Sequence, residues 1–268
     1  MRIWELEAVL ESGRVRVERS DATVIVTIAN PPVNALHPAV AEEIHAVIET
    51  AVAGDQSVRS LVLTGEGKCF VAGGDIAHFR TLDCSTAETY ALGIQHMQNA
   101  LQQLSVPVIA AVNGAALGGG CELMMACDIR IADERAIFGL PEVTLGIIPG
   151  AGGTQYLPRL VSTGMAKRML FSGERIDAAK AQAIGLVDEV TPAGGVLDAA
   201  LDLAQRINAN APLAVAAAKR SVNLGTQMAL ADALKLEAGL FGGLFRSEDV
   251  AEGVAAFLEK RTPDFRGA

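Results

Sequence analysis

The stretch that decides the fold runs from residue 107 to residue 132 and reads PVIAAVNGAALGGGCELMMACDIRIA. Its first six residues form a short apolar run, which indicates a buried strand. Gly118, Gly119 and Gly120 follow, and an apolar helix carrying a single acid, Glu122, comes next. A helix that begins in a glycine cluster has free backbone N–H groups beside the positive end of its dipole. The stretch therefore predicts a strand, a turn and a helix N-terminus that can hold an oxyanion.

A second loop has the same character. Residues 60–65, SLVLTG, are typical of a buried strand, and they are followed by the loop that contains Ala72, Gly73, Gly74 and Asp75. This loop can offer another backbone N–H from the opposite side. Two such donors directed at one carbonyl oxygen form an oxyanion hole, in which the loss of one donor costs about 2.7–4 kcal/mol of activation free energy.

Two carboxylates lie in apolar surroundings near these loops. Glu122 is followed by Leu123 and Met124, and Glu142 lies within FGLPEVTLG. A carboxylate in an apolar environment is costly, so such residues are candidates for function. The structural alternative is that each caps a helix or pairs with an arginine. Two carboxylates in different environments suit acid/base chemistry on carbon, because one can be ionised while the other is protonated.

The rest of the chain alternates strands with helices and then becomes helical. Pro38 suits the first position of a helix, and Ser85 with Glu88 has the spacing of a capping box for a helix to about Leu104. From residue 196 the pattern indicates helices only, the last of them ending near Lys260. Further strands are predicted at 14–18, 22–29, near 128–138 and at 186–190. The fold class is therefore α/β with a C-terminal helical extension.

Composition narrows the function classes. The net charge of −9 over 268 residues argues against nucleic acid or an anionic membrane as the main partner. No stretch of 18 apolar residues and no signal peptide is visible, so we expect a cytoplasmic protein with free thiols. The sequence lacks the common motifs for nucleotide, dinucleotide, serine-hydrolase and zinc chemistry. The four histidines and four cysteines show no metal-ligand spacing: His37, His45, His78, His96, Cys69, Cys84, Cys121 and Cys127.

The ordered set of motifs resembles the crotonase (enoyl-CoA hydratase/isomerase) superfamily. The decisive stretch is similar to the superfamily signature, as is FGLPEVTLGIIPGAGGTQYLPRLV at 138–161. FVAGGDI at 70–76 resembles the first oxyanion loop, and SGERIDAAKAQAIGLVDEV at 172–190 resembles the usual next segment. FLEKRTPDF at 257–265 is similar to the hydratase C-terminus. The agreement extends over about residues 15–266.

The resemblance implies a spiral of ββα repeats in residues 1–195 and a helical region in 196–268 that assembles the chain into trimers or pairs of trimers. It implies that Gly74 and Gly119 hold the thioester carbonyl. Glu122 and Glu142 match the two hydratase glutamates, of which one activates water and the other delivers a proton to Cα. The positions that match coenzyme A contacts are Ala35, Ala72, Asp75, Ile76 and, from a neighbouring subunit, Lys260.

The implied activity is the reversible hydration of 2-trans-enoyl-CoA, with coenzyme A as part of the substrate and no separate cofactor or metal. The alternatives are another two-glutamate crotonase, such as a specialised acyl-CoA dehydratase or isomerase, and an RNA-binding protein that keeps the fold without the activity. Isomerases of the superfamily commonly lack the first glutamate. One departure is visible, because Ala77 and His78 stand where many hydratases carry a lysine after Asp-Ile.

Overall fold

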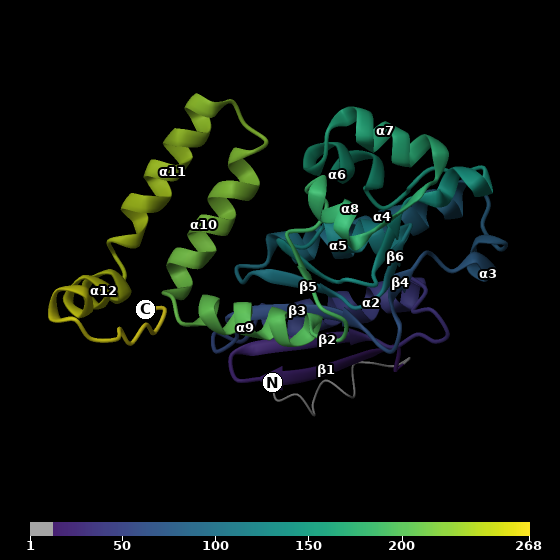
Figure 1. The fold of residues 1–268 in the computed structure, drawn as a ribbon. Helices are drawn as coiled ribbons and strands as arrows, with labels where there is room; N and C mark the ends of the chain where they lie inside the picture. Colours follow the sequence, from purple (N-terminus) through teal and green to yellow (C-terminus); the bar gives the residue numbers. More distant parts are fainter. Residues whose placement is uncertain (1–12) are drawn as a thin grey trace.

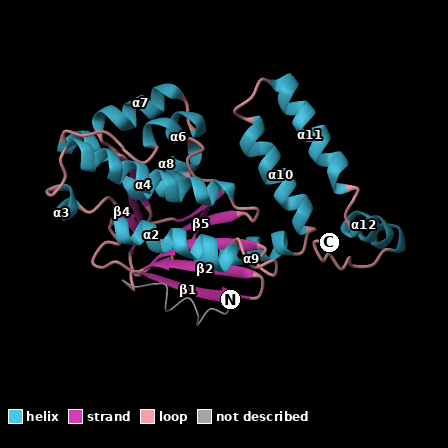
Figure 2. Ribbon diagram, turned by 180° about the vertical axis from the view of Figure 1, so that it is seen from behind, coloured by secondary structure: helices cyan, strands magenta, loops and turns pink. Residues whose placement is uncertain are grey.

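The computed structural model describes residues 13–268, which form two β-sheets surrounded by helices, with a helical extension at one end (Figures 1 and 2). The six-stranded sheet has the order β1 (Val15–Ser20), β2 (Thr23–Ile28), β3 (Ser60–Gly65), β5 (Val108–Val112), β7 (Ile129–Asp133) and β10 (Glu189–Thr191). The four-stranded sheet has the order β4 (Cys69–Ala72), β6 (Ala115–Leu117), β8 (Ile137–Gly139) and β9 (Arg175–Asp177). Neighbouring strands are parallel except for the pairs β1–β2 and β8–β9.

From β3 to β8, consecutive strands alternate between the two sheets. β3 leads to β4, β5 to β6 and β7 to β8, and each pair gives its first strand to the larger sheet and its second to the smaller one. Close backbone approach makes the crossing between sheets possible: a Cβ atom on Gly114 would overlap the carbonyl oxygen of Lys68. The Asn113 side chain donates hydrogen bonds to the carbonyls of Gly65 and Gly67, which ties two successive crossings together. This arrangement confirms the predicted spiral of ββα repeats.

Helices surround the two sheets. They are α2 (Pro38–Val47), α3 (Ile76–Phe79), α4 (Cys84–Gln103), α5 (Gly119–Met125), α6 (Gly153–Leu160), α7 (Thr163–Ser172), α8 (Ala178–Ala183) and α9 (Val196–Asn208), with a π-helical turn η1 (Ile48–Val52) and a 3₁₀ turn η2 (Pro141–Leu145). α9 packs on the larger sheet and α5 on the smaller one. The side chains of β5 divide between two cores, since Val108 and Ala110 pack with the main core whereas Ile109 and Ala111 pack beneath α9. A strand buried on both faces reads as a continuous apolar run, which explains PVIAAV.

Most predicted elements are present, and two predictions need correction. Pro38 is the first residue of α2, and the helix predicted to reach Leu104 ends at Gln103. The predicted capping box of Ser85 and Glu88 is wrong. Asp83 caps α4 instead, because its carboxylate accepts the N–H of Thr86 while the Thr86 hydroxyl accepts the N–H of Asp83. The strand predicted at 186–190 begins only at Glu189.

The C-terminal extension consists of α10 (Pro212–Gly225), α11 (Leu230–Leu244) and α12 (Glu248–Glu259). α10 and α11 form a pair that stands apart from the sheets, and α12 lies beside the C-terminal end of α11, on the side away from the sheets (Figures 1 and 2). The tail returns to the core through Arg59, which donates to the carbonyls of Asn208 and Phe265. Asp249 holds the same tail by accepting the N–H groups of Arg266 and Gly267. Among the described residues, no helix has the length and apolar character needed to cross a membrane.

Candidate active site

Three predicted site residues lie just beyond the carboxyl ends of parallel strands in the four-stranded sheet. Gly74 lies two residues after β4, Gly119 lies two residues after β6, and Glu142 lies three residues after β8. β4, β6 and β8 are neighbours in that order. Because the carboxyl ends of parallel strands meet at one edge of a sheet, successive turns of the spiral bring these residues together.

The two predicted oxyanion donors are close to each other and unused. A Cβ atom built on Gly119 would lie 3.7 Å from the backbone nitrogen of Gly74 and 3.3 Å from Cδ2 of Leu36. Within residues 13–268, the N–H groups of Gly74 and Gly119 donate to no protein acceptor. Gly118 caps α5 with a φ of 50°, in the left-handed region that favours glycine, and so turns the chain into the helix. Both donors are therefore free to bind one oxygen atom.

Glu122 is a buried carboxyl group on α5, with only 2% of its surface exposed. Its Oε1 accepts the N–H of Ala151 at 2.8 Å and the N–H of Gly153 at 2.7 Å. The pKa of Glu122 is raised from 4.5 to about 7. Burial is the main cause, the nearby Glu142 adds to it, and the N–H bonds from Gly153 and Ala151 act in the opposite direction. The group is therefore poised to gain or lose a proton near neutral pH.

Glu142 is on the 3₁₀ turn η2, which begins with Pro141 and ends at Gly146 with a left-handed φ of 76°. Its Oε1 lies 2.9 Å from where a Cβ on Gly118 would stand, so the carboxylate faces the start of α5. Its Oε2 is buried and has no hydrogen-bond partner among the described residues. Burial raises the pKa of Glu142 as well. Neither glutamate forms an ion pair with an arginine in the described chain. The helix-capping alternative does hold for Glu122, which accepts the N–H of Gly153, the first residue of α6.

The proposed coenzyme A positions form one strip, with one exception. The Ala35 carbonyl accepts from the Asn30 side chain at 2.7 Å, and the N–H of Ala72 donates to the carbonyl of Val33 at 3.0 Å, which joins the two segments. Asp75 caps α3, and Ile76 follows with 51% of its surface exposed. Lys260 is the exception. It ends α12, at the opposite end of the molecule from α3 (Figures 1 and 2), and a single chain does not bring it to the strip.

Comparison with known proteins identifies the family. The profile described as Enoyl-CoA hydratase/isomerase matches residues 18–268. The chain belongs to this family. It is 42% identical to the short-chain-enoyl-CoA hydratase of Clostridium acetobutylicum over 94% of this chain and 97% of that protein. It is 44% identical to the crotonyl-CoA hydratase of Syntrophomonas wolfei, over 93% and 96%. A crystal structure of enoyl-CoA hydratase from Bacillus anthracis superposes with a TM-score of 0.92 at 39% identity, covering 95% of this chain and all of that one (100%).

Sequence reasoning missed several residues that shape the site of this family member. The N–H groups of Ala151 and Gly153 hold Glu122, although GAGG at 150–153 appeared only as part of a resemblance. Gln95 on α4 donates to the carbonyl of Gly150 at 2.8 Å and so supports the same loop. Tyr90, also on α4, lies beside Gly74. No local pattern marks these residues, because their partners are distant in the sequence.

The histidines, which are scattered in the sequence, pair in the fold. The rings of His45 and His96 are 4.6 Å apart and those of His37 and His78 are 5.2 Å apart. His45, His78 and His96 line a cleft of about 540 Å³ between α2 and α4. Within residues 13–268, no group of three or more His, Cys, Asp or Glu side chains is arranged to hold a metal ion.

Proposed function

We propose that this protein is an enoyl-CoA hydratase that adds water reversibly across the 2,3 double bond of 2-trans-enoyl-CoA to give 3-hydroxyacyl-CoA. The observation that carries the proposal is the pair of glutamates in unequal environments beside two unused N–H donors. Relatives more than 40% identical over most of the chain have names that specify the same reaction.

The two N–H groups act on the thioester carbonyl. When water attacks Cβ, negative charge moves through Cα onto the carbonyl oxygen, where Gly74 and Gly119 stabilise it. One glutamate accepts the proton that water loses, and the other delivers a proton to Cα. The net addition is one hydroxyl group at Cβ and one hydrogen at Cα. The raised pKa of both carboxyl groups suits them to proton exchange near neutral pH.

The test replaces each carboxylate by its amide. We expect Glu122→Gln and Glu142→Gln each to lower kcat by about 10²–10⁴, with little change in affinity for coenzyme A. Loss of the absorbance of the conjugated enoyl thioester measures the rate. Glu88→Gln, on the exposed side of α4, is the matched control and should keep wild-type activity. Near-full activity in either site variant would exclude the assigned role.

The oxyanion hole needs a variant that removes a backbone donor. Gly119→Pro abolishes one N–H, and Gly119 is the first residue of α5, a position that tolerates proline. We expect kcat to fall by about 10²–10³. Circular dichroism must show that the variant is folded. A folded Gly119→Pro enzyme with normal turnover would reject the assignment.

The acyl group is the open part of the substrate. The relatives from C. acetobutylicum and S. wolfei have names that specify short-chain and crotonyl substrates. Assays on a short-to-long series of 2-trans-enoyl-CoA thioesters give kcat/KM for each chain length. We expect short chains to react fastest. Coenzyme A is part of the substrate, and the proposal needs no separate cofactor. The four free cysteines support a reducing cytoplasmic location.

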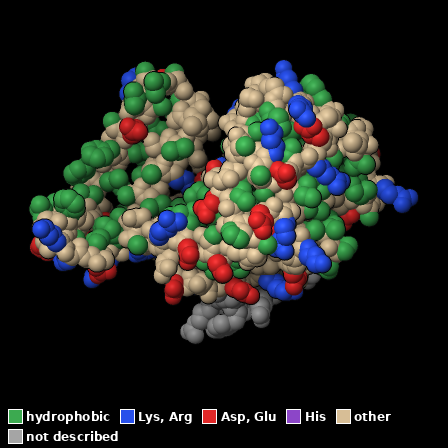
Figure 3. Space-filling model, in the orientation of Figure 1, with side chains coloured by type: hydrophobic (Ala, Val, Ile, Leu, Met, Phe, Trp, Pro, Cys, Tyr) green, Lys and Arg blue, Asp and Glu red, His purple; other side chains and the backbone are tan. Residues whose placement is uncertain are grey.

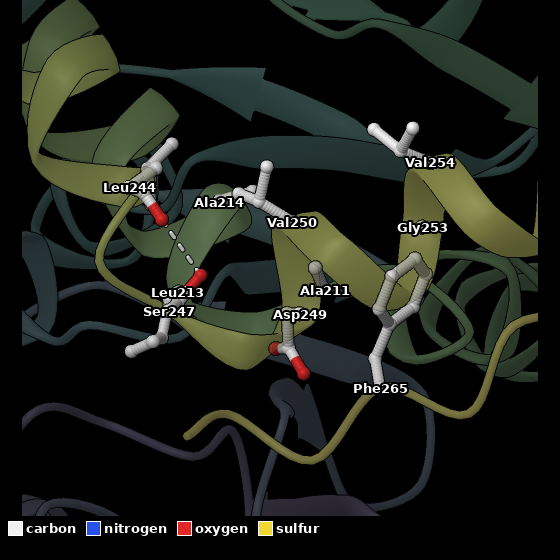
Figure 4. A pocket seen from close by; sticks show the side chains of 10 residues that line it. All are labelled: Ala211, Leu213, Ala214, Leu244, Ser247, Asp249, Val250, Gly253, Val254 and Phe265. Atoms are coloured by element: carbon white, nitrogen blue, oxygen red, sulfur yellow. Dashed lines mark hydrogen bonds between the residues drawn. The ribbon is translucent and has the colours of Figure 1, made fainter.

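We further propose that the helical extension assembles the chain into a trimer or a pair of trimers. α10 and α11 have no buried residue, and large apolar side chains are exposed along the extension (Figure 3), among them Leu230, Phe241, Phe245 and Phe257. A mostly apolar hollow of about 240 Å³ opens between α10, α12 and Phe265 (Figure 4). Apolar surfaces of this kind mark interfaces.

Assembly also gives Lys260 a role, because a neighbouring copy can carry it to a coenzyme A site that its own chain does not reach. α9 packs on the larger sheet, so the contact surface is expected on α10–α12. Sedimentation at micromolar concentration measures the assembly. A stable, fully active monomer would contradict both the assembly and the shared site.

A further inference from the structure

Tyr90 connects helix α4 to the backbone that carries the first oxyanion donor. Its hydroxyl donates a hydrogen bond to the carbonyl oxygen of Leu36 at 2.9 Å, across 54 residues of sequence. Its ring packs edge-on against Phe79, with 5.4 Å between ring centroids. We propose that Tyr90 is a positioning residue of the oxyanion hole, which holds the Gly74 N–H in place through Leu36. The proposal rests on the enoyl-CoA hydratase function given above.

Leu36 is the link because it contacts both sides of the hole. Its N–H donates to the carbonyl of Gly73 at 2.9 Å, one residue before the first donor. Its side chain lies against Gly119, where a Cβ would approach Cδ2 to 3.3 Å. Leu36 is 1% exposed, so its carbonyl depends on protein donors. Removing the Tyr90 hydroxyl takes away the side-chain donor at this carbonyl and loosens the segment that spaces the two N–H groups.

Tyr90 also touches the donor residue itself. A Cβ on Gly74 would lie 3.2 Å from the Tyr90 oxygen and 2.6 Å from Cζ of Phe79. Gly74 does not have a positive φ, so a side chain at this position would meet the two rings rather than an unfavourable backbone conformation. The two rings therefore form the surface on which the Gly74 backbone is seated. The N–H of Gly74 has a fixed direction only while that surface is intact.

Tyr90 acts by position and does not transfer protons. Burial raises the pKa of its hydroxyl, and the nearby carboxylates of Glu122 and Asp75 raise it further. The hydroxyl therefore stays protonated throughout the working pH range, and its proton is directed at Leu36. A change at Tyr90 should lower the rate by displacing a donor, not by removing an acid.

The test uses the two tyrosines of the chain as a matched pair. Tyr90→Phe keeps the ring and removes only the hydroxyl. Tyr156→Phe is the control, because Tyr156 is also partly buried and near Glu122, but its hydroxyl pairs with Gln102 on α4 rather than with an oxyanion loop. We expect Tyr90→Phe to lower kcat by about 10- to 100-fold while KM for enoyl-CoA changes less than about twofold, since a small misplacement at a reacting centre costs up to about 100-fold. Tyr156→Phe should keep kcat within about twofold.

A spectroscopic readout separates positioning from general loss of structure. Isotope-edited infrared difference spectra report the C=O stretch of a thioester bound to the protein. We expect the stretch to move to higher frequency in Tyr90→Phe, because a displaced donor polarises the carbonyl less, and to be unchanged in Tyr156→Phe. Gly74→Ala, which keeps the N–H but presses a methyl group against the same rings, should give the same signature. The double variant, Tyr90→Phe with Gly74→Ala, should lower kcat by less than the product of the two single effects, because both substitutions disturb the same N–H donor.

The outcomes are distinct. Inactive wild-type protein would contradict the proposed function and not the placement of Tyr90. Active wild type, with Tyr90→Phe equal to it in kcat and carbonyl frequency, would overturn the inference. Equal losses in the two Tyr→Phe variants would overturn it too. If Tyr90→Phe were poorly folded, the carbonyl frequency in Gly74→Ala, compared with that in Tyr156→Phe, would test the inference instead. A wild-type frequency in Gly74→Ala would refute the role of this ring surface.

Discussion

Glu122→Gln should stabilise the fold above neutral pH, although under the proposed function it lowers kcat by about 10²–10⁴. The wild-type carboxyl group is buried, and burial raises its pKa from 4.5 to about 7. The folded protein therefore binds this proton more tightly than the unfolded chain does, between pH 4.5 and pH 7. Stability from this group is fully present below pH 4.5 and is lost as the pH rises through 7. At pH 8 the folded state must hold a buried negative charge.

The structure gives the size of the effect. A pKa that rises from 4.5 to about 7 corresponds to about 3 kcal/mol of unfolding free energy, at about 1.4 kcal/mol for each pH unit. Most of it, about 2.5 kcal/mol, is lost between pH 5 and pH 8. Glutamine is neutral at both pH values, and its side-chain oxygen can accept the same N–H groups of Ala151 and Gly153. Relative to wild type, the variant should gain about 2.5 kcal/mol over this interval.

The assay is urea unfolding of both proteins at pH 5 and pH 8, at one fixed protein concentration because assembly contributes to stability. Glu88→Gln, an exposed substitution of the same kind, should show no pH-dependent gain. A difference between Glu122→Gln and wild type that stays constant from pH 5 to pH 8 would refute the reasoning. So would a variant that is less stable than wild type at pH 8.

Four further substitutions test the packing and the end of α12. Gly120→Ala should fail to fold or lose several kcal/mol of unfolding free energy, because a Cβ would overlap the carbonyl of Val71. Gly93→Ala, on the open side of α4, should raise the unfolding free energy by about 1 kcal/mol, measured by thermal unfolding. Gln98→Met should raise the free energy of unfolding by about 1–3 kcal/mol, because both amide atoms of Gln98 are buried without a partner in the described chain; a less stable variant would reveal a bound group there. Lys260→Gly relieves a left-handed φ of 56° at the end of α12, so the unfolding free energy should not fall. KM for enoyl-CoA should rise about two- to fivefold, because the variant removes the lysine proposed to reach a neighbour's coenzyme A site. An unchanged KM would argue against the shared site.

The sequence predicts the fold well wherever local pattern and burial agree. The run at 107–112 is apolar at every position because β5 is covered on both faces, so a strand is the expected structure. The glycine cluster before Glu122 can be recognised in the sequence because the start of α5 requires two kinds of glycine. Gly118 has a left-handed φ, and Gly120 has no space for a Cβ. The apolar residues on either side of the two glutamates can also be read from the sequence. They indicate burial, and burial raises the pKa of both carboxyl groups.

Long-range contacts are what the sequence conceals. The capping residue of α4 is Asp83 and not Ser85, since several neighbouring polar residues can serve and local geometry chooses among them. Tyr90 reaches Leu36 across 54 residues, and nothing near it indicates that partner. The histidine pairs have the same origin, because His45 and His96 meet only when α2 packs on α4. Such contacts become predictable only when the packing of the helices is known.

The repeated strand ends have a consequence for how new chemistry arises on this scaffold. Each successive turn of the spiral places one of three residues a few positions after the end of a strand: Gly74, Gly119 and Glu142. Under the proposed function, a substitution at such a position alters a group that acts on the substrate without changing a residue inside either sheet. The activity can therefore diverge while the fold is retained. A protein engineer can change residue 142 to vary the reaction and leave the sequence of both sheets unchanged.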